Sequence, residues 1–553
     1  MHCNNLLLVQ ERYTISPVFP SYPTGIPSLN EKPFDIIIIG SGISALTTAA
    51  LMSSINKKRV LIVEQHDRIG GYTHTFTRKG YTWDVGFHYI GEIFNKKLAG
   101  LVMNFITGGK LTWRKTPEPF ETFIYPGFTF SMYGNKKKFK SDLLARFPHE
   151  SKAIHLYFRD INKVSLWFVC DFLSRFLPAV LKVPVFLVRM VHDRLALMST
   201  EDYMKRFKDE KLRSILTSQW GNYGLPPSQS VFMIHGLIVQ HFINGGYYPE
   251  GGSGEIAKNS LPQIEKYGGK TIVNCKVREI LIHNNRATGV AVETREKGMN
   301  IRREYSAPVI VSCAGAFNTF TKLIAEKHNF PFVKKCRELN RPSVCVALYL
   351  GLKGDIRSLG ITGSNCWIYN TLNHESSYNN TTLLQGKPSS CFVSFIPSTE
   401  QPDTFKTATI ISLTSYSHFE KWRHQTRGKR SSDYYLLKET IARGLIDFVN
   451  AQYPGFSKAI DYYELGTPLS AEDFTECPEG AMYGLAATAE RYKEKWLAPV
   501  TPVKGLYLTG SDISSLGIVP SMMSGLATAS VLSGPWGLFK IVAHVRRFSR
   551  KKL

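Results

Sequence analysis

The pattern of apolar and polar positions predicts a strand–helix–strand unit near the start of the chain. Residues 36–39 are four isoleucines, residues 43–55 carry Ala and Leu at helical spacing, and residues 59–63 form a second apolar run. Short continuous β-branched runs are typical of strands buried on both faces, as in parallel sheets. We therefore expect a βαβ unit that follows an irregular lead-in over residues 1–33.

Further apolar runs predict two more groups of elements. Residues 111–240 are aromatic and basic, and their pattern is mostly helical without a parallel-strand signature. The other predicted helices cover residues 255–266, residues near 434–451, and a small-residue segment from residue 521. The other predicted strands are residues 270–273, 277–282, 287–293, 309–313, 343–350, 409–413 and 505–509.

The most apolar stretch, residues 163–194, predicts an amphipathic helical segment that does not span a bilayer. Spanning takes about 20 consecutive apolar residues, and Pro178 and Pro184 should break or kink the helix. Two interpretations stay open: a core-facing helix pair, or a monotopic membrane contact or roof of a substrate tunnel. Four charged residues interrupt the run near one helical stripe: Asp171, Arg175, Lys182 and Arg189.

Length and charge bound the class of protein. A chain of 553 residues is long enough for two or three domains. The 68 Lys and Arg against 44 Asp and Glu give a net charge of +24, which favours a polyanionic partner or reflects a basic surface without one. No nucleic-acid-binding signature is present, so we expect a peripheral or monotopic contact with an anionic membrane and no nucleic acid.

The termini and the cysteines refine this expectation. Residues 536–553 mix apolar and basic positions at helical spacing, which fits either an interfacial helix or a solvated basic tail. No secretory signal is visible, and the nine scattered cysteines indicate no structural metal or disulfide framework. The body of the protein is therefore predicted to face the cytoplasm.

The glycines after the first predicted strand indicate nucleotide binding. Gly40 permits a tight turn, Gly42 lets the backbone approach a pyrophosphate at a helix N-terminus, and Ala45 is small enough for close packing. The second strand ends at Glu64, where an acid binds a ribose hydroxyl and would repel a 2′-phosphate. A second match at residues 252–257 follows no buried strand, so we do not interpret it as a nucleotide motif.

Two further segments favour FAD over NAD. Gly70 and Gly71 follow the acid by six residues, which lets the backbone run along a ligand longer than one nucleotide. At the other end of the chain, the strand at 505–509 places Asp512 near a helix start and Gly517 before the final small-residue helix. Backbone N–H groups at such a helix are suited to a flavin pyrimidine ring.

Together these segments resemble one family. GSGISALTTAA, EQHDRIGGYTHTF, DVGFHYIG, WGNYGLPP, GGYYPEGGSGEIA and GLYLTGSDISSLG are similar to the retinol saturase and carotenoid isomerase branch of the FAD-dependent oxidoreductases, which is related to phytoene desaturases and amine oxidases. The resemblance covers residues 34–535. It implies an α/β fold, with a Rossmann-like FAD-binding domain built from discontinuous segments and a mixed α+β substrate domain with a tunnel for a polyene.

The resemblance also implies domain limits and cofactor contacts. The FAD-binding domain would comprise residues 34–110, 245–330 and 496–535, and the substrate domain residues 111–244 and 331–495, with 536–553 as a basic tail. Val277 would contact adenine through backbone atoms. The other implied FAD-binding residues are Gly40, Ser41, Gly42, Ala45, Glu64, Gln65, Arg68, Gly70, Gly71 and Asp512.

The implied reaction saturates a polyene double bond, which requires a hydride from reduced flavin and a proton. No second nucleotide fingerprint is present, so flavin reduction would need a transient NAD(P)H or another donor. Candidate proton donors are His88, Tyr89, His235, Tyr247 and His74, although a packed or solvated residue is the more common role for each of these residue types.

Two alternatives stay open. The same fold supports cis/trans isomerisation or desaturation of a carotenoid-like substrate. A protein of another class, a non-enzymatic prenyl or lipid carrier of the GDP-dissociation-inhibitor type, also shares the fold. The intact Gly40, Gly42, Glu64 and Gly70–Gly71 argue against the carrier, which has no physical need for all of them.

Overall fold

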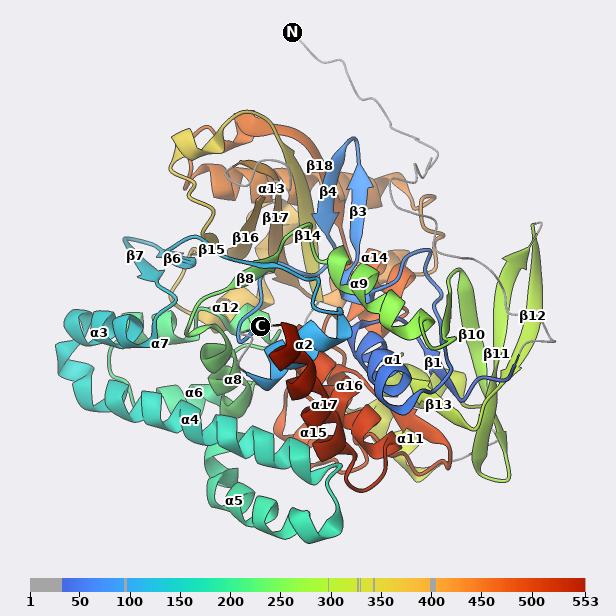
Figure 1. Ribbon diagram of the computed structural model, residues 1–553. Coiled ribbons are helices and arrows are strands. Elements are labelled where there is room, and N and C mark those ends of the chain that lie inside the picture. The colour runs from blue at the N-terminus through green and yellow to red at the C-terminus, as the bar shows by residue number, and fades with distance from the viewer. Residues whose placement is uncertain are drawn as a thin grey trace.

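A five-stranded parallel sheet forms one half of the molecule. The structure, a computed structural model, describes residues 32–93, 97–296, 298–325, 328, 330–341, 344–397 and 404–552 (Figure 1). The strand order is β19-β13-β1-β2-β9, and every neighbouring pair is parallel. The strands are β1 (Ile36–Ile39), β2 (Val60–Val63), β9 (Lys270–Ile272), β13 (Val309–Ser312) and β19 (Leu506–Leu508).

Both faces of this sheet are covered, which explains its continuous apolar runs. Ile36 and Ile38 join a core with α1 (Ile43–Asn56), α9 (Gly254–Glu265) and α16 (Ile518–Leu532). Ile37 and Ile39 join the opposite core, which includes side chains of an antiparallel sheet, β10 (Cys275–His283), β11 (Arg286–Glu296) and β12 (Met299–Ser306). The predicted βαβ unit is confirmed. The strands come from all three segments expected for the FAD-binding domain, whereas the exact domain limits stay predictions.

A seven-stranded mixed sheet forms the other half and corrects one expectation. Residues 111–240 contain β6 and β7, although their pattern predicted helices and no parallel strand. β6 pairs parallel with β15 and antiparallel with β7. In order, the strands are β18 (Ile460–Gly466), β14 (Val344–Leu352), β17 (Phe405–Thr414), β16 (Ser390–Pro397), β15 (Asn365–Tyr369), β6 (Glu121–Tyr125) and β7 (Phe128–Met132).

Smaller elements connect and cover the two sheets. The short strands are β3 (Thr75–Arg78), β4 (Tyr81–Asp84), β5 (Trp113–Lys115) and β8 (Tyr247–Pro249). The helices, besides those named elsewhere, are α2 (Leu98–Ile106), α3 (Lys136–Arg146), α6 (Thr200–Met204), α7 (Glu210–Thr217), α8 (Phe232–Phe242), α10 (Ala316–Asn318), α11 (Pro331–Glu338), α12 (His374–Asn379), α13 (Ser432–Asn450), α14 (Pro468–Thr475) and α15 (Ala489–Lys493).

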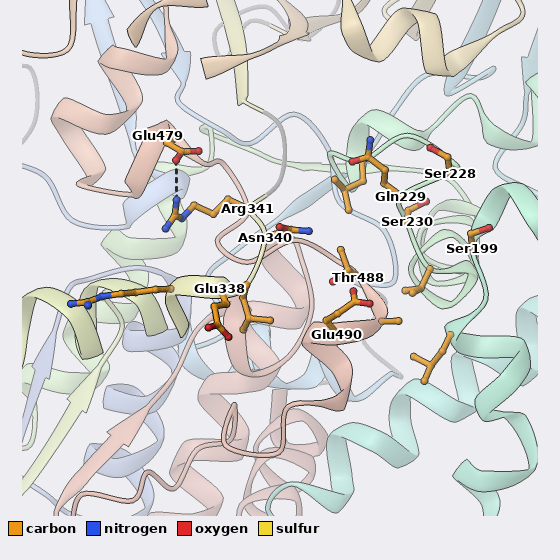
Figure 2. A pocket seen from close by; sticks show the side chains of 16 residues that line it. Ser199, Ser228, Gln229, Ser230, Glu338, Asn340, Arg341, Glu479, Thr488 and Glu490 are labelled. Carbon is orange, nitrogen blue, oxygen red and sulfur yellow. Dashed lines mark hydrogen bonds and ion pairs between the residues drawn. The ribbon is translucent and has the colours of Figure 1, made fainter. Parts of the chain in front are cut away.

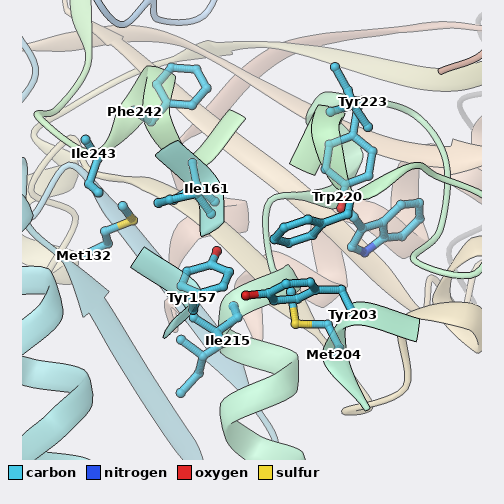
Figure 3. Packing of buried hydrophobic residues seen from close by; sticks show 14 of the residues in the cluster. Met132, Tyr157, Ile161, Tyr203, Met204, Ile215, Trp220, Tyr223, Phe242 and Ile243 are labelled. Atoms are coloured by element: carbon cyan, nitrogen blue, oxygen red, sulfur yellow. The ribbon is translucent and has the colours of Figure 1, made fainter. Parts of the chain in front are cut away.

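The helical segment beside the second sheet is a hairpin of α4 (Ser151–Ser174) and α5 (Ala179–Leu197). The expected break occurs at Pro178, whereas α5 continues through Pro184. The inner face of α4 contributes Tyr157 and Ile161 to a large aromatic core (Figure 3). No helix within the described ranges is long and apolar enough to cross a membrane.

The C-terminal segment is α17 (Gly537–Lys552), as its periodicity predicts. Ile541 and Val545 are fully buried against the core of the first sheet. These apolar positions therefore belong to the core and are not free to enter a membrane. Trp536 and Phe539 remain exposed.

Candidate functional site

The carboxyl ends of the parallel strands bring the predicted cofactor residues together. Gly40 follows β1, Glu64 follows β2, Cys313 follows β13 and Gly510 lies two residues after β19. The chain runs from β1 to β2 on one side, while β13 lies on the other side of β1. Open parallel sheets bind ligands at such a switch point, beyond the carboxyl ends of the strands. We call this region the carboxyl edge.

Glu64 organises the first part of the carboxyl edge. Its Oε2 accepts hydrogen bonds from the Ser41 backbone N–H at 2.8 Å and from the Ser41 hydroxyl at 2.6 Å. Its Oε1 accepts a third from the backbone N–H of His66 at 2.8 Å. The Ser41 hydroxyl in turn accepts one from Gly70 N–H at 3.0 Å. The glycine loop, the acid and the second glycine pair therefore form one unit.

The glycines of this unit are required by its backbone geometry. Gly40 has a φ of +87°, in the region that favours glycine. A Cβ at Gly71, where φ is +56°, would lie 3.2 Å from the Cα of Gly42, so the two glycine loops pack backbone to backbone. Ala45 is fully buried, in line with a position that requires only a small side chain.

The remaining predicted contacts lie at or near this unit. Cys275 donates its backbone N–H to the Glu64 carbonyl at 2.9 Å, which places Val277, two residues further along β10, close to the end of β2. The Gln65 amide donates to the Phe474 carbonyl at 3.3 Å, and the Arg68 guanidinium donates to the Thr75 carbonyl at 2.8 Å. These two side chains therefore contact the protein itself.

Asp512 approaches from the C-terminal segment. Its carboxylate accepts the backbone N–H of Ala316 at 2.7 Å and that of Leu485 at 2.9 Å. A Cβ at Gly484 would lie only 2.2 Å from Asp512 Oδ1, so glycine is needed there. Neither Gly484 nor Ala316 carries a sequence motif that would have predicted this contact.

Two helix N-termini at this edge fit the phosphate and ring groups of FAD. α1 begins after Gly42 with no side-chain cap at that residue and no acidic residue in its first turn. The uncharged Cys313 thiol lies against the Gly42 and Ala45 N–H groups, so an anion bound at this helix N-terminus would lie beside that thiol. α16 begins after Gly517, likewise with no side-chain cap, and a Cβ there would meet nothing within 4 Å. The Ser514 hydroxyl nearby is buried without a partner among the described residues. The residues present therefore fit a dinucleotide that reaches from α1 to α16.

A chain segment connects the carboxyl edge with the second sheet. A Cβ at Gly86 would lie 2.8 Å from the Tyr72 ring, which follows Gly71. Two residues later, His88 lines a cavity of about 310 Å³. Its lining combines apolar side chains, Phe395, Ile396 and Phe405, with the cationic Arg114, Lys115 and Arg357. Burial lowers the pKa of His88 to about 4, so its ring is neutral at pH 7.

The next residue, Tyr89, meets a buried carboxyl group that sequence reasoning missed. The Tyr89 hydroxyl donates a hydrogen bond to Glu121 and accepts one from the Asn222 amide at 3.3 Å. Glu121 is fully buried on β6 and also accepts from the Gln219 amide and, at 3.1 Å, from the Trp367 indole. Burial raises the pKa of Glu121 to about 7. A signal existed, because Glu121 shares an alternating strand face with buried Phe123 and Tyr125.

The other proton-donor candidates differ in setting. His235 lies in the aromatic core, where its Nε2 is 2.8 Å from the Tyr157 hydroxyl, and burial lowers its pKa to about 3. Tyr247 pairs through its backbone with Ile90, and burial raises the pKa of its hydroxyl. His74 hydrogen-bonds the Gly71 carbonyl through its ring, and burial lowers its pKa to about 4.

A second cavity, of about 780 Å³, has a mainly polar lining (Figure 2). Arg341 and Glu479 form an ion pair of 2.9 Å at one side, and Asn340, Thr488 and Glu490 lie nearby. The backbone N–H of Ala486 donates to the Asn340 carbonyl at 2.9 Å, so this wall adjoins the segment that contacts Asp512. None of the predicted site residues lines this cavity.

Comparison with known proteins agrees with this geometry. A family model for an NAD(P)-binding Rossmann-like domain matches residues 38–102, and one for a GMC oxidoreductase matches residues 247–324. A solved putrescine oxidase structure superposes with a TM-score of 0.59 over 91% of this chain and 99% of its own, at 16% identity. The fold is that of the FAD-dependent oxidoreductases.

Sequence relatives identify the family more closely. An all-trans-retinol 13,14-reductase of Danio rerio is 32% identical over 529 residues, which cover 90% of this chain and 86% of the relative. A 28% identical relative from the same organism, named an inactive all-trans-retinol 13,14-reductase, covers 91% and 86%. A prolycopene isomerase of Arabidopsis thaliana is 24% identical and covers 92% and 84%. The chain belongs to the all-trans-retinol 13,14-reductase family.

Proposed function

We propose that the protein saturates a carbon–carbon double bond of an apolar polyene, retinol-like or carotenoid-like, with FAD bound at the carboxyl edge. The observation that carries this proposal is the continuous arrangement from Glu64 and Gly71, through Gly86, to the Tyr89–Glu121 pair. The names of the relatives support a polyene as the substrate class.

The residues proposed to hold FAD are those predicted from the sequence. The α1 N-terminus would bind the pyrophosphate, Glu64 a ribose hydroxyl, and Asp512 with the α16 N-terminus the ribityl and ring end. Bound FAD in its reduced form would supply the hydride. The electron donor is proposed to be a transient NAD(P)H or another reductant. The polar cavity of Figure 2 suits such a molecule better than it suits a polyene.

Saturation also needs a proton, and the Tyr89–Glu121 pair is the best source among the candidates. A carboxyl group with a pKa near 7 can lose and regain a proton at neutral pH. Tyr89 would pass this proton to the substrate, because its hydroxyl contacts Glu121. His88 and His235 are weaker candidates, since their lowered pKa values leave their rings neutral at pH 7, and a neutral imidazole is a very weak acid.

The test separates saturation from the other reactions of this fold. The FAD-loaded enzyme is incubated without oxygen with retinol, carotenes and unsaturated isoprenoids, in one sample with the flavin photoreduced and in a second with the flavin oxidised, and the products are analysed by mass. A gain of two hydrogens supports the proposal. An unchanged mass with a new isomer identifies an isomerase, a loss of two hydrogens identifies a desaturase, and unaltered substrates from a flavin-loaded chain contradict all three.

A Tyr89→Phe variant tests the proton source within this assay. The variant removes one hydroxyl and retains the ring that packs on Phe242 at a centroid distance of 4.4 Å. We expect a loss of about 100-fold in the rate of product formation, in the range typical of a positioned acid. Phe substitution of Tyr247 is the matched control, and an equal loss there would contradict the assignment to Tyr89.

A further inference from the structure

The α4–α5 hairpin has an outward face built of aliphatic side chains. Within α5, Ala196 is the one buried residue. Val180, Val183, Leu187 and Val191 are 73%, 62%, 58% and 76% exposed. Figure 1 shows α5 at the lower edge of the molecule, with α4 between it and the body. Soluble monomers rarely expose an apolar patch that continues along several helical turns.

Three charged residues of the same hairpin point the other way. Asp171, Arg175 and Arg189 have side chains only 4%, 10% and 15% exposed. Arg175 forms an ion pair of 2.8 Å with Asp171, and Arg189 lies 3.3 Å from the other oxygen of the same carboxylate. Three residues of the predicted charged stripe therefore face inward, whereas the fourth, Lys182, is exposed.

These inward charges fix the hairpin to the protein. The Arg175 guanidinium donates to the carbonyls of Leu497 at 2.6 Å and of Tyr492 at 3.2 Å. On the second helix, Arg189 also pairs with Asp193 at 3.4 Å, and the Trp167 indole donates to that carboxylate at 2.5 Å. α5 is therefore held in place by ion pairs and hydrogen bonds, which leaves its aliphatic face uncovered.

The chemistry of the exposed face fits a lipid surface. α5 exposes two cationic residues, Lys182 and Arg194, on a chain with a net charge of +24. Its one acidic residue, Asp193, has a side chain that is 40% exposed and is paired with Arg189. Residues 180–191 span about 17 Å at 1.5 Å per residue, which is shorter than the roughly 30 Å hydrocarbon core of a bilayer. Such a helix can lie in the plane of the interface with its apolar side in the acyl boundary.

We propose that the α4–α5 hairpin attaches the protein to one leaflet of an anionic membrane. α5 inserts its Val183–Leu187–Val191 face, Lys182 and Arg194 contact acidic head groups, and the buried ion pairs hold α5 against α4. This attachment is independent of the proposed reaction, because neither FAD nor substrate is needed for it.

The test uses the full-length chain and vesicles of phosphatidylcholine with or without phosphatidylserine. We expect sedimentation with the anionic vesicles, weakened by salt, and a binding constant at least tenfold lower for the double variant Val183→Asp/Leu187→Asp. The matched control is Leu436→Asp on α13, where Leu436 is 68% exposed, and it should bind like the wild type. Wild-type protein that stays in the supernatant, or a double variant that binds like the control, would overturn the proposal.

A second variant keeps the test independent of folding in the double variant. Phe186→Trp introduces an indole at a 46% exposed position of α5. Its fluorescence should shift to the blue and be quenched by brominated acyl chains when anionic vesicles are added. The exposed face could instead be an interface between two copies of the chain, and gel filtration tests this alternative. If the wild type is a dimer that does not bind vesicles, and if Val183→Asp/Leu187→Asp dissociates this dimer, the face belongs to a second copy and the proposal is overturned.

Discussion

Two buried glutamates, one in each half of the molecule, have opposite surroundings. Glu64 accepts its hydrogen bonds from backbone N–H groups and a hydroxyl within a short stretch of chain that begins at Ser41. Glu121 accepts from three side chains, those of Tyr89, Gln219 and Trp367. The first setting suits an acceptor that binds ribose, and the second suits a carboxyl group that exchanges a proton.

The largest effect should follow a charge reversal at the first glutamate. Glu64→Arg removes the acceptor for the Ser41 and His66 N–H groups and places a bulky cation at a position that is 8% exposed. We expect FAD affinity to fall about 1000-fold, or roughly 4 kcal/mol, measured by flavin titration of a chain with an unchanged circular dichroism spectrum. Glu304→Arg, at a 57% exposed side chain, is the control. Undiminished flavin content would show that ribose binds elsewhere.

The second glutamate, Glu121, should make the free energy of unfolding depend on pH. Its pKa rises from 4.5 in the unfolded chain to about 7 in the folded protein. The folded state therefore binds the extra proton, and the stabilisation is complete below about pH 4.5 and is lost as the pH rises through 7. This amounts to about 3 kcal/mol at 1.36 kcal/mol per pKa unit.

Glu121→Gln tests this prediction because the amide does not titrate. The free energy of unfolding of the wild type, measured in urea, should fall relative to that of the variant between pH 4.5 and 7. Two parallel pH profiles would contradict the raised pKa and would remove Glu121 as the proton source.

A smaller effect concerns the close packing of Gly484 against a third carboxylate, that of Asp512. Two glycine-to-alanine substitutions distinguish this packing from backbone strain. Gly484→Ala places a Cβ 2.2 Å from Asp512 Oδ1, whereas Gly354→Ala, at the same φ of +73°, meets nothing within 4 Å. Both substitutions place an alanine in the left-handed backbone region, so this strain is the same in the two variants. The free energy of unfolding should therefore fall by about 2 kcal/mol more for Gly484→Ala, because only this variant is overpacked. Thermal unfolding measures it, and equal losses would show that Asp512 moves aside freely.

The contrast between the two glutamates also explains what could be predicted. The cofactor unit could be predicted from the sequence because Gly40, Gly42 and Glu64 lie in one βαβ segment, where local turn geometry and strand burial produce a recognisable sequence pattern. Glu121 could not be predicted in the same way, because its partners come from three distant segments. In addition, the strand pattern of β6 is short and lies within residues 111–240, whose overall pattern predicts helices. Long-range side-chain contacts leave no periodic signal.

The two amphipathic helical segments make the same point about orientation. Periodicity predicted both α17 and the hairpin, but it cannot state which face points inward. α17 buries Ile541 and Val545, as an ordinary surface helix does. α5 exposes Val183 and Val191 and holds Arg189 inside. Only the folded structure separates a helix that buries its apolar face from one that exposes it.

The central claim is that the carboxyl edge of the parallel sheet holds one FAD. The most direct measurement is the visible absorbance spectrum of the purified protein, before and after FAD is added and free cofactor is removed. The account predicts a yellow protein with one FAD per chain, whose flavin is released by acid. A protein that stays colourless after FAD is added would contradict the claim and would favour the alternative of a non-enzymatic prenyl or lipid carrier.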